Sequence, residues 1–265
     1  MLSTILSQTS EIFPLTSLLG DISSITSPDH PDQKESLGVQ NLNPDSTSLQ
    51  SEDIISDDDP FMKDTLKRVW LNETDPLAVC NDGSSAAMYW RKKEGGSNKW
   101  LIYLEAGGQC YDEASCADRQ IKMPTFMSSE SYPEYMSISG VFAADEKYST
   151  MHDANKAYLR YCSSDGHMGN VDYPNGSEYQ FRGEKTVDAM IDYLIANKSL
   201  GSSPSDLVVF GGFSAGARGA MVHIDKISER LLRQKGMNNV KGLLDSPLYL
   251  DVEPLYPSNL TGLNY

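Results

Sequence analysis

The chain has 265 residues, of which 39% are hydrophobic, so it is long enough to bury the core of one large domain or two small ones. Its formal net charge of -15 at pH 7 argues against binding to nucleic acid or to anionic membranes, because phosphate groups would repel it. No apolar run is long enough to span a bilayer, and residues 1–20 lack the basic start and uninterrupted apolar stretch of a signal peptide.

The first 66 residues differ in composition from the rest of the chain. They are rich in Ser, Asp, Pro, Asn and Gln, and they show no sustained helical or strand period. We therefore predict a disordered, acidic and Ser-rich leader over residues 1–66 and a folded domain over residues 67–265.

Beyond the leader, apolar runs and helical periods alternate along the chain. Strands are predicted at 86–91 and 99–105, and the turn at 94–98 predicts that they form a hairpin. Residues 111–156 are irregular, and such a long excursion inside a compact domain is usually a functional lid or rim. The further predicted elements are a strand at 156–161, a helix over 187–195, a strand at 207–210, a helix ending near 234 and a strand at 240–244. This alternation predicts an α/β fold with a doubly wound, mostly parallel sheet.

The sequence G-F-S-A-G at 212–216 lies between a predicted strand and a predicted helix. This is the order of a nucleophile elbow, in which a sharp turn pushes the serine hydroxyl outward and glycines allow strand and helix to pack closely. Ser214 is therefore the candidate nucleophile. A glycine turn kept for packing alone is the alternative interpretation.

A second glycine-rich turn, Ala106–Gly107–Gly108, follows the buried strand at 99–105. Hydrolases with a nucleophile elbow place an oxyanion-binding N–H group at the end of such an early strand. Gly107 and Gly108 carry no side chains that would block a scissile carbonyl. A plain turn accounts for them equally well.

Four cysteines are present, and none has the C-x-x-C spacing of a zinc or redox site. Cys110 and Cys116 lie close enough in sequence to close a small disulfide ring. Together with an even cysteine count, four N-glycosylation sequons favour an oxidising, secretory environment. The sequons begin at Asn72, Asn175, Asn197 and Asn259.

Six short motifs follow one another along the chain: C-N-D-G-S at 80–84, L-E-A-G-G at 104–108, Y-C-S-S-D at 161–165, F-R-G at 181–183, G-F-S-A-G at 212–216 and L-D-S at 244–246. In this order they resemble the pectin acetylesterase family, including its Notum-like palmitoleoyl-protein carboxylesterases, over residues 71–251. The resemblance implies an α/β-hydrolase fold, a secreted protein, and catalysis without a metal or organic cofactor. It assigns Ser214 as nucleophile and the N–H groups of Gly107, Gly108 and Ala215 as the oxyanion hole.

The resemblance also implies disulfides Cys80–Cys162 and Cys110–Cys116 and a glycan on Asn72. The chain departs from the family in one respect close to the site. Where the Notum-like members have a tryptophan after the glycine pair, this chain has Gly108 and then Gln109. A differently shaped acyl pocket is therefore expected.

The catalytic triad is the larger departure. Hydrolases of this fold have the order Ser, Asp or Glu, His, and no histidine follows Asp245 in this chain. The family's acid and histidine lie further downstream than Tyr265, so we expect a fragment that lacks the last strands of the sheet. His223 falls on nearly the opposite face of its helix from Ser214. His152 and His167, on loops, are weak alternative bases, and Asp245 is a candidate acid.

Two hypotheses follow. The first is a serine carboxylesterase acting on an acylated polysaccharide or an acylated protein. The second is a non-catalytic binding protein or inactive fragment on the same scaffold, because the triad histidine is missing. The sequence does not indicate an oligomeric state.

Overall fold

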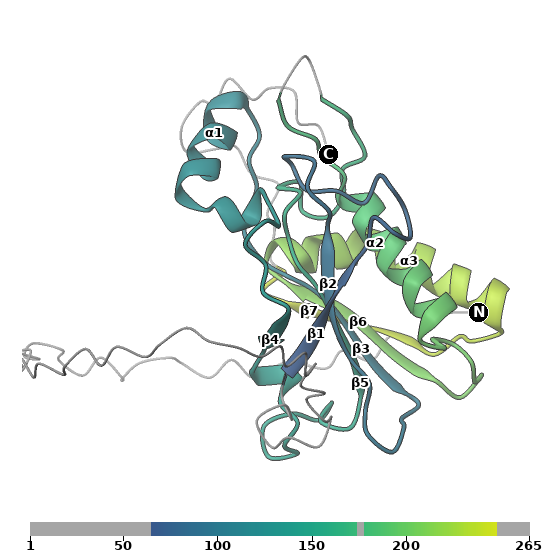
Figure 1. Cartoon of the computed structure of the whole chain (residues 1–265). Coiled ribbons are helices and arrows are strands. Elements are labelled where there is room, and N and C mark those ends of the chain that lie inside the picture. Colours follow the sequence, from purple (N-terminus) through teal and green to yellow (C-terminus); the bar gives the residue numbers. More distant parts are fainter. Residues whose placement is uncertain (1–64, 174–177, 248–265) are drawn as a thin grey trace, which may run out of the picture. The chain divides into compact units, whose positions relative to one another are not determined.

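The computed structural model describes residues 65–173 and 178–247 (Figure 1). They form a seven-stranded sheet with the strand order β4-β1-β2-β5-β3-β6-β7. The strands are β1 (Thr65–Trp70), β2 (Ala87–Arg91), β3 (Lys99–Leu104), β4 (Tyr135–Ser137), β5 (Asn155–Leu159), β6 (Leu207–Phe213) and β7 (Val240–Asp245). The helices are α1 (Glu113–Lys122), α2 (Gly183–Asn197) and α3 (Ala215–Lys235), and two 3-10 turns are η2 (Pro124–Phe126) and η3 (Gly140–Phe142).

The predicted leader lies outside the described residues, apart from its last two, which belong to β1. Leu66 is fully buried in the sheet. The last two residues of the predicted leader therefore belong to the folded sheet.

The sheet is mixed, and its two halves differ in strand direction. The pairs β4/β1, β1/β2 and β2/β5 are antiparallel, whereas β5/β3, β3/β6 and β6/β7 are parallel. The predicted hairpin of β2 and β3 is wrong, because β5 lies between them and pairs with both. Local alternation and a turn indicate strands but not their partners, and here the buried residues of β5 supply the better central neighbour.

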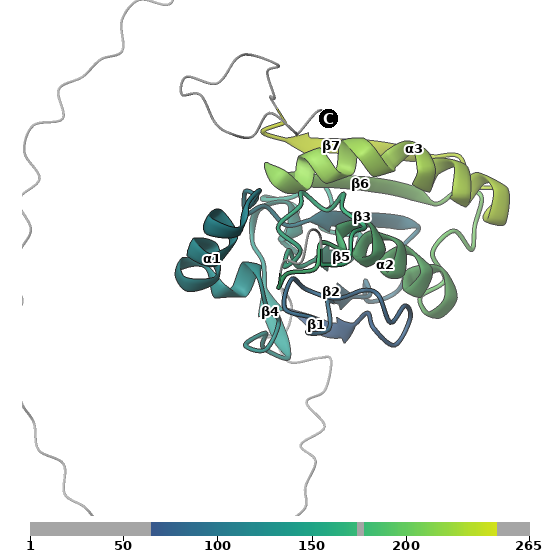
Figure 2. The ribbon, with the colours of Figure 1, turned by 90° about the horizontal axis from the view of Figure 1, so that it is seen from above.

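Two helices cover one face of the sheet. Apolar residues of α2 and α3, such as Val187 and Ile227, join the largest buried cluster together with strand residues such as Ile102. Figure 2 shows both helices on the same side of the strands. On the other face, Phe142 and Met151, from the segment between β4 and β5, pack against the strands. The buried α2 stripe is the predicted core stripe.

The segment 111–156 is less irregular than predicted, because it contains α1 and the short strand β4. Asp112 starts α1 as its N-cap and accepts a hydrogen bond from the N–H of Ser115. The Ser115 hydroxyl in turn accepts from the backbone N–H of Asp112, which completes a capping box. The D-x-x-S pattern was the local signal for this helix.

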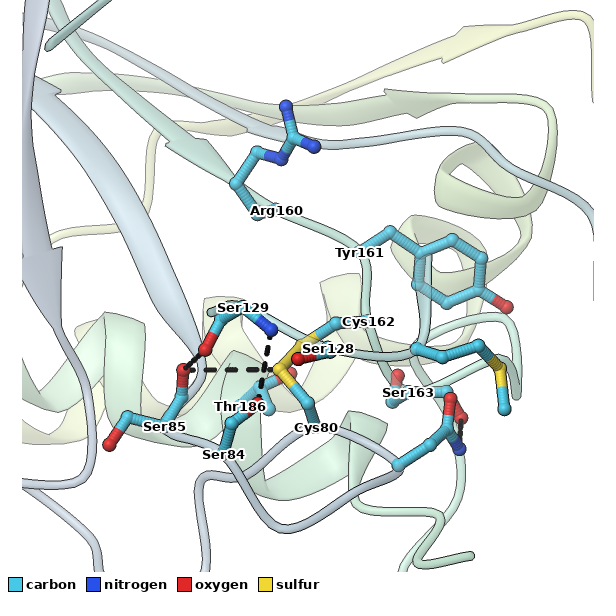
Figure 3. The surroundings of a disulfide bond; sticks show 12 residues. Cys80, Ser84, Ser85, Ser128, Ser129, Arg160, Tyr161, Cys162, Ser163 and Thr186 are labelled. Carbon is cyan, nitrogen blue, oxygen red and sulfur yellow. Dashed lines mark hydrogen bonds between the residues drawn. A yellow bond between two sulfur atoms is a disulfide. The ribbon is translucent and has the colours of Figure 1, made fainter. Parts of the chain in front are cut away.

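Both disulfides that the resemblance implies are present: Cys80–Cys162 and Cys110–Cys116. Cys80–Cys162 ties the loop after β1 to the segment that follows β5, and Figure 3 shows it beside the hydrogen bond from the Ser129 hydroxyl to the Ser85 carbonyl.

Candidate functional site

Ser214 occupies the turn between β6 and α3 in a conformation that few residues other than glycine adopt. Its backbone angles are φ 52° and ψ −114°. Such a conformation costs about 1–3 kcal/mol and persists only where the surrounding structure enforces it. Here the enforcement is close packing, because a Cβ on Gly212 would lie 2.3 Å from the carbonyl carbon of Gly216. The strained serine between β6 and α3 has the backbone arrangement expected of a nucleophile elbow.

The start of α3 also packs against the end of β3. A Cβ on Gly216 would lie 2.1 Å from the Leu104 carbonyl oxygen and 2.8 Å from that of Glu105. Only a glycine at position 216 allows this approach. The contact brings Ser214 and Ala215 to the point where the 105–108 turn leaves β3.

The turn after β3 uses both of its glycines for conformations that other residues rarely adopt. Gly107 has φ 151° and Gly108 has φ 66°. The Gly107 carbonyl accepts a hydrogen bond from Arg119 at 2.6 Å, and the Gly108 carbonyl accepts one from the Tyr161 hydroxyl at 2.7 Å. Within the described ranges, no hydrogen bond uses the N–H of Gly107, Gly108 or Ala215 as donor.

A buried carboxylate organises the loop behind this turn. Asp165 accepts hydrogen bonds from the Ser163 hydroxyl and from the N–H groups of His167, Gly169 and Gly183, at 2.7 to 3.0 Å. Burial raises the pKa of Asp165 to about 6, against the lowering effect of these donors. The loop at 163–169 is thereby pinned to the start of α2.

Glu105 is the first residue after β3 and joins the ends of β3 and β5. Its Oε2 lies 3.0 Å from the Arg160 Nε and accepts the Tyr161 N–H at 2.8 Å. The two charged side chains are only 12% and 14% exposed, and burial raises the pKa of Glu105 while Arg160 lowers it. The ion pair thus links the carboxyl ends of β3 and β5 next to the Gly107 turn.

None of the three described histidines hydrogen-bonds to Ser214. His167 is buried and stacks on Tyr161, and its Nε2 lies 2.9 Å from the Glu105 carbonyl oxygen. Burial lowers the pKa of His167 to about 4. The His223 Nε2 lies 2.7 Å from the His167 carbonyl oxygen, so its ring faces that loop. Its pKa is also lowered by burial. The fourth, His30, lies outside the described residues.

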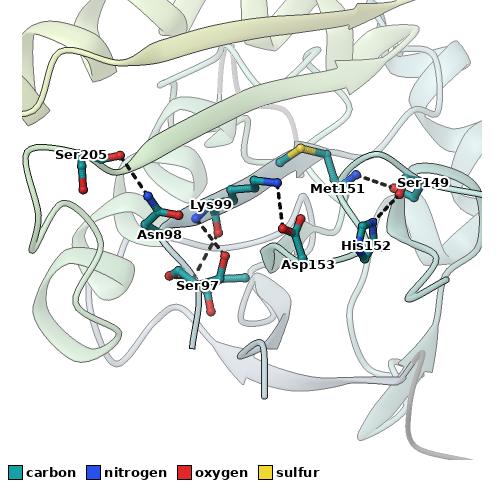
Figure 4. A network of polar contacts seen from close by, with 9 residues as sticks. Ser97, Asn98, Lys99, Ser149, Met151, His152, Asp153 and Ser205 are labelled. Carbon is teal, nitrogen blue, oxygen red and sulfur yellow. Dashed lines mark hydrogen bonds and ion pairs between the residues drawn. The ribbon is translucent and has the colours of Figure 1, made fainter. Parts of the chain in front are cut away.

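His152 lies at the opposite end of the strands from Ser214. It precedes the amino end of β5 and its Nδ1 lies 3.0 Å from the Ser149 carbonyl, next to the Lys99–Asp153 ion pair (Figure 4). The parallel strands carry Ser214 at their opposite, carboxyl ends, about 13 Å away along β5 at 3.3 Å per residue. The structure therefore does not bring His152 to the elbow.

Asp245 ends β7 beside the elbow, and its backbone carbonyl accepts the Ser214 N–H at 2.9 Å. Its side chain is exposed and accepts a hydrogen bond from the Ser246 hydroxyl. Burial, and to a smaller extent the charge of Asp245, raises the pKa of Tyr103 to about 12. It lies near the candidate nucleophile without a described histidine as partner.

A pocket of about 440 Å³ lies beside the elbow. Phe213, the residue before Ser214, and Gly107 both line it. Aromatic and aliphatic side chains form most of its wall, including those of Phe126, Val141 and Phe142. Such a wall suits an apolar group.

Several other predicted features can be placed. Asn72 and Asn197 are exposed, whereas Asn175 and Asn259 lie outside the described residues. In the part of the chain that the structure describes, no cluster of three metal-ligating side chains occurs. Among the same residues, no helix is long and apolar enough to cross a membrane.

The residues that the sequence reasoning missed lie behind the site. Arg119 and Tyr161 donate to the carbonyls of Gly107 and Gly108, and Asp165 holds the 163–169 loop behind them. Nothing in their local sequence marks these roles. Tyr161 and Asp165 fall within a recognised motif, whereas Arg119 lies in the segment interpreted as irregular.

Comparison with known proteins gives consistent results. The family model for pectinacetylesterase matches residues 63–262. Notum, a palmitoleoyl-protein carboxylesterase of Drosophila melanogaster, is 34% identical over 200 residues, which is 73% of this chain and 29% of Notum. The human Notum is 32% identical over 176 residues, which is 65% of this chain and 34% of its own length. The chain thus spans about a third of the length of these curated relatives.

The structural comparison agrees. A crystal structure of the Wnt deacylase Notum from Drosophila matches with a TM-score of 0.66 and 34% identity, covering 74% of this chain and 55% of that one. A second crystal form matches with a TM-score of 0.67. The predicted α/β-hydrolase-like fold is confirmed, and the chain belongs to the pectinacetylesterase family.

Proposed function

We propose that the protein is a carboxylic ester hydrolase with Ser214 as its nucleophile. One observation carries the proposal: the elbow holds Ser214 at φ 52° directly beside a glycine turn whose N–H groups make no hydrogen bonds within the described ranges. A strained serine between a strand and a helix, next to free backbone donors, is the arrangement expected for acyl transfer. Family membership supports the same reaction class.

In the proposed reaction, the Ser214 Oγ attacks the acyl carbonyl carbon and gives up its proton to a base. The carbonyl oxygen becomes an oxyanion that the N–H groups of Gly107, Gly108 and Ala215 stabilise. Collapse of the tetrahedral intermediate expels the alcohol, and water then hydrolyses the acyl-enzyme. Removing one oxyanion donor typically costs about 10²–10³ in kcat.

We propose an acylated protein or an acylated polysaccharide as substrate. The relatives are named for palmitoleoyl-protein esters, and the family model is named for pectin acetyl esters. The aromatic wall of the pocket beside Phe213 favours an acyl chain longer than acetyl.

Hydrolysis of 4-nitrophenyl acetate and 4-nitrophenyl octanoate by the full chain tests both points. Ser214→Ala should abolish turnover of both esters, and Ser205→Ala, on an exposed turn, serves as the matched control. A higher kcat/KM for octanoate would support the acyl-chain assignment. Equal activity in Ser214→Ala would refute the mechanism.

A second candidate function is recognition of an acylated ligand without hydrolysis. It is favoured by the hydrogen bonds of the described histidines, which go to the backbone carbonyls of Ser149, Glu105 and His167. The two candidates separate in one experiment, in which a fluorescent acylated peptide is titrated into the folded protein while ester cleavage is followed. Saturable binding without cleavage would favour the second candidate.

We also propose that the protein passes through the secretory pathway and carries a glycan on Asn72. The two disulfides and the exposure of Asn72 support this assignment. Glycosidase treatment of the protein expressed in eukaryotic cells should reduce its mass, and Asn72→Gln should remove part of that reduction. If all four cysteines were found as free thiols in the native protein, that result would contradict secretion.

A further inference from the structure

Helix α1 contacts the Gly107 turn through the two residues of the helix that are buried. Cys116 forms the disulfide with Cys110, two residues after Gly108. Arg119, one turn further along α1, donates to the Gly107 carbonyl. Residues three positions apart lie on one face of a helix. One face of α1 is therefore attached to the turn at two points.

Arg119 is held in one orientation by its surroundings. Its Nη1 donates to the Gly107 carbonyl at 2.6 Å and its Nε to the Ser164 hydroxyl at 2.8 Å. Its guanidinium also lies 5.0 Å from the ring centre of Phe126 and 5.5 Å from that of Tyr161. No carboxylate of the described residues pairs with it, although it is only 4% exposed. A buried charge without a counter-ion costs stability, so packing alone does not explain why an arginine occupies position 119.

The bond from Arg119 fixes the direction of the next N–H group. A trans peptide is planar, with its C=O and N–H pointing in opposite directions, and the described chain has no cis peptide. With the Gly107 carbonyl turned toward Arg119, the N–H of Gly108 must point away from α1. Glycine at φ 66° can otherwise rotate easily, since it lacks the side chain that restricts other residues.

Tyr161 fixes the following peptide in the same manner. Its hydroxyl donates to the Gly108 carbonyl at 2.7 Å and accepts the N–H of Gly166 at 2.6 Å. Its ring contacts both the guanidinium of Arg119 and the stacked imidazole of His167. The two carbonyls of the turn are thus both bound from behind.

We propose that Arg119 is a positioning residue that aims the Gly108 N–H at the oxyanion, with α1 as the brace that carries it and Tyr161 as its partner. The inference rests on the proposed ester hydrolysis for its catalytic consequence. The orientation of the peptide is a separate, purely structural claim. A misplacement of about 1 Å in such a donor can lower the rate about 10²-fold.

The test compares four variants of the full chain. Arg119→Ala removes the bond to Gly107, and Arg119→Lys keeps a cation that can reach the same carbonyl. Tyr161→Phe removes only the hydroxyl. Lys122→Ala is the matched control, because Lys122 lies on α1 but is exposed and, among the described residues, pairs only with Asp118. Each variant is assayed for kcat and KM on a nitrophenyl ester and for hydrogen–deuterium exchange of the peptide spanning residues 105–110.

We expect Arg119→Ala and Tyr161→Phe to increase exchange at the turn and to lower kcat about 10- to 100-fold. KM should change less than about threefold, and Arg119→Lys should recover part of the kcat loss. If Arg119→Ala does not fold, the lysine and phenylalanine variants still decide the question. Exchange and kcat that match the Lys122→Ala control in every folded variant would overturn the proposal. One further outcome separates the two claims. If Arg119→Ala and Tyr161→Phe lose exchange protection while the wild type and Ser214→Ala are equally inactive, the positioning claim is supported and the esterase proposal is refuted.

Discussion

Replacement of Gly216 by alanine is the most direct perturbation of the elbow. The added methyl group would lie 2.1 Å from the Leu104 carbonyl oxygen, 2.6 Å from its carbon and 2.8 Å from the Glu105 carbonyl oxygen. All three atoms belong to backbone, so no flexible side chain can move aside. Real Cβ atoms do not approach closer than about 3.0 Å, so α3 or the end of β3 must shift by about 0.9 Å.

The magnitude follows from that shift. Overpacking with a backbone displacement costs typically 1–3 kcal/mol, and three backbone contacts place Gly216→Ala at about 3 kcal/mol. For a domain of this size the midpoint of thermal unfolding should fall by about 6–12 °C. The same displacement separates Ser214 from the Gly107 turn, and a shift near 1 Å is expected to lower kcat about 10²-fold.

The assay is thermal unfolding together with nitrophenyl ester hydrolysis. Gly242→Ala is the matched control, because the nearest atom to a Cβ there is the terminal Cδ1 of the Ile224 side chain, at 3.1 Å, and not a backbone atom. We expect Gly242→Ala to behave nearly as wild type in both measurements. A Gly216→Ala protein with wild-type stability and kcat would refute the close contact between α3 and β3.

Two further predictions concern stability. Replacing both Cys80 and Cys162 by alanine should lower the free energy of unfolding by about 4–5 kcal/mol, because the disulfide joins residues 82 positions apart, and urea unfolding with and without reductant measures it. His167, with its pKa lowered from 6.5 to about 4, contributes about 3 kcal/mol that is present above pH 6.5 and is lost as the pH falls toward 4. Asp165, with its pKa raised from 3.8 to about 6, contributes stability that is present below pH 3.8 and is lost as the pH rises toward 6. The two effects oppose each other between pH 4 and 6, so the free energy of unfolding of the wild type should be nearly independent of pH there. That of His167→Gln should fall as the pH rises from 4 to 6. A free energy of unfolding of His167→Gln that does not change with pH in urea titrations would contradict this.

Much of the α/β framework could be predicted because its signals are local. The buried run of β3, the amphipathic stripe of α2 and the glycine-flanked Ser214 each occupy a few consecutive residues. Strand pairing is not local in this sense. The prediction that β2 and β3 form a hairpin was wrong because β5, more than fifty residues further along the chain, pairs with both strands instead.

The candidate site divides in the same way. Ser214 and the glycines of the 107–108 turn are recognisable because glycine at fixed spacing has a conformational reason. Arg119 gives no such signal, because its partner is a backbone carbonyl twelve residues away and any sequence has that carbonyl. The helix that carries it was hidden by a polar composition, although Asp112 and Ser115 encode its cap.

The geometry of the glycine turn therefore depends on residues that lie outside it. Three carbonyls in the 105–108 segment are within hydrogen-bonding distance of buried side chains, those of His167, Arg119 and Tyr161. Glycines supply the freedom to adopt the turn but cannot select one orientation of its peptides, because their φ and ψ are the least restricted of any residue. Selection must come from these three donors, since each fixed carbonyl also fixes the N–H that follows it. For the proposed oxyanion hole, a substitution behind the turn should therefore lower kcat about as much as a substitution within it.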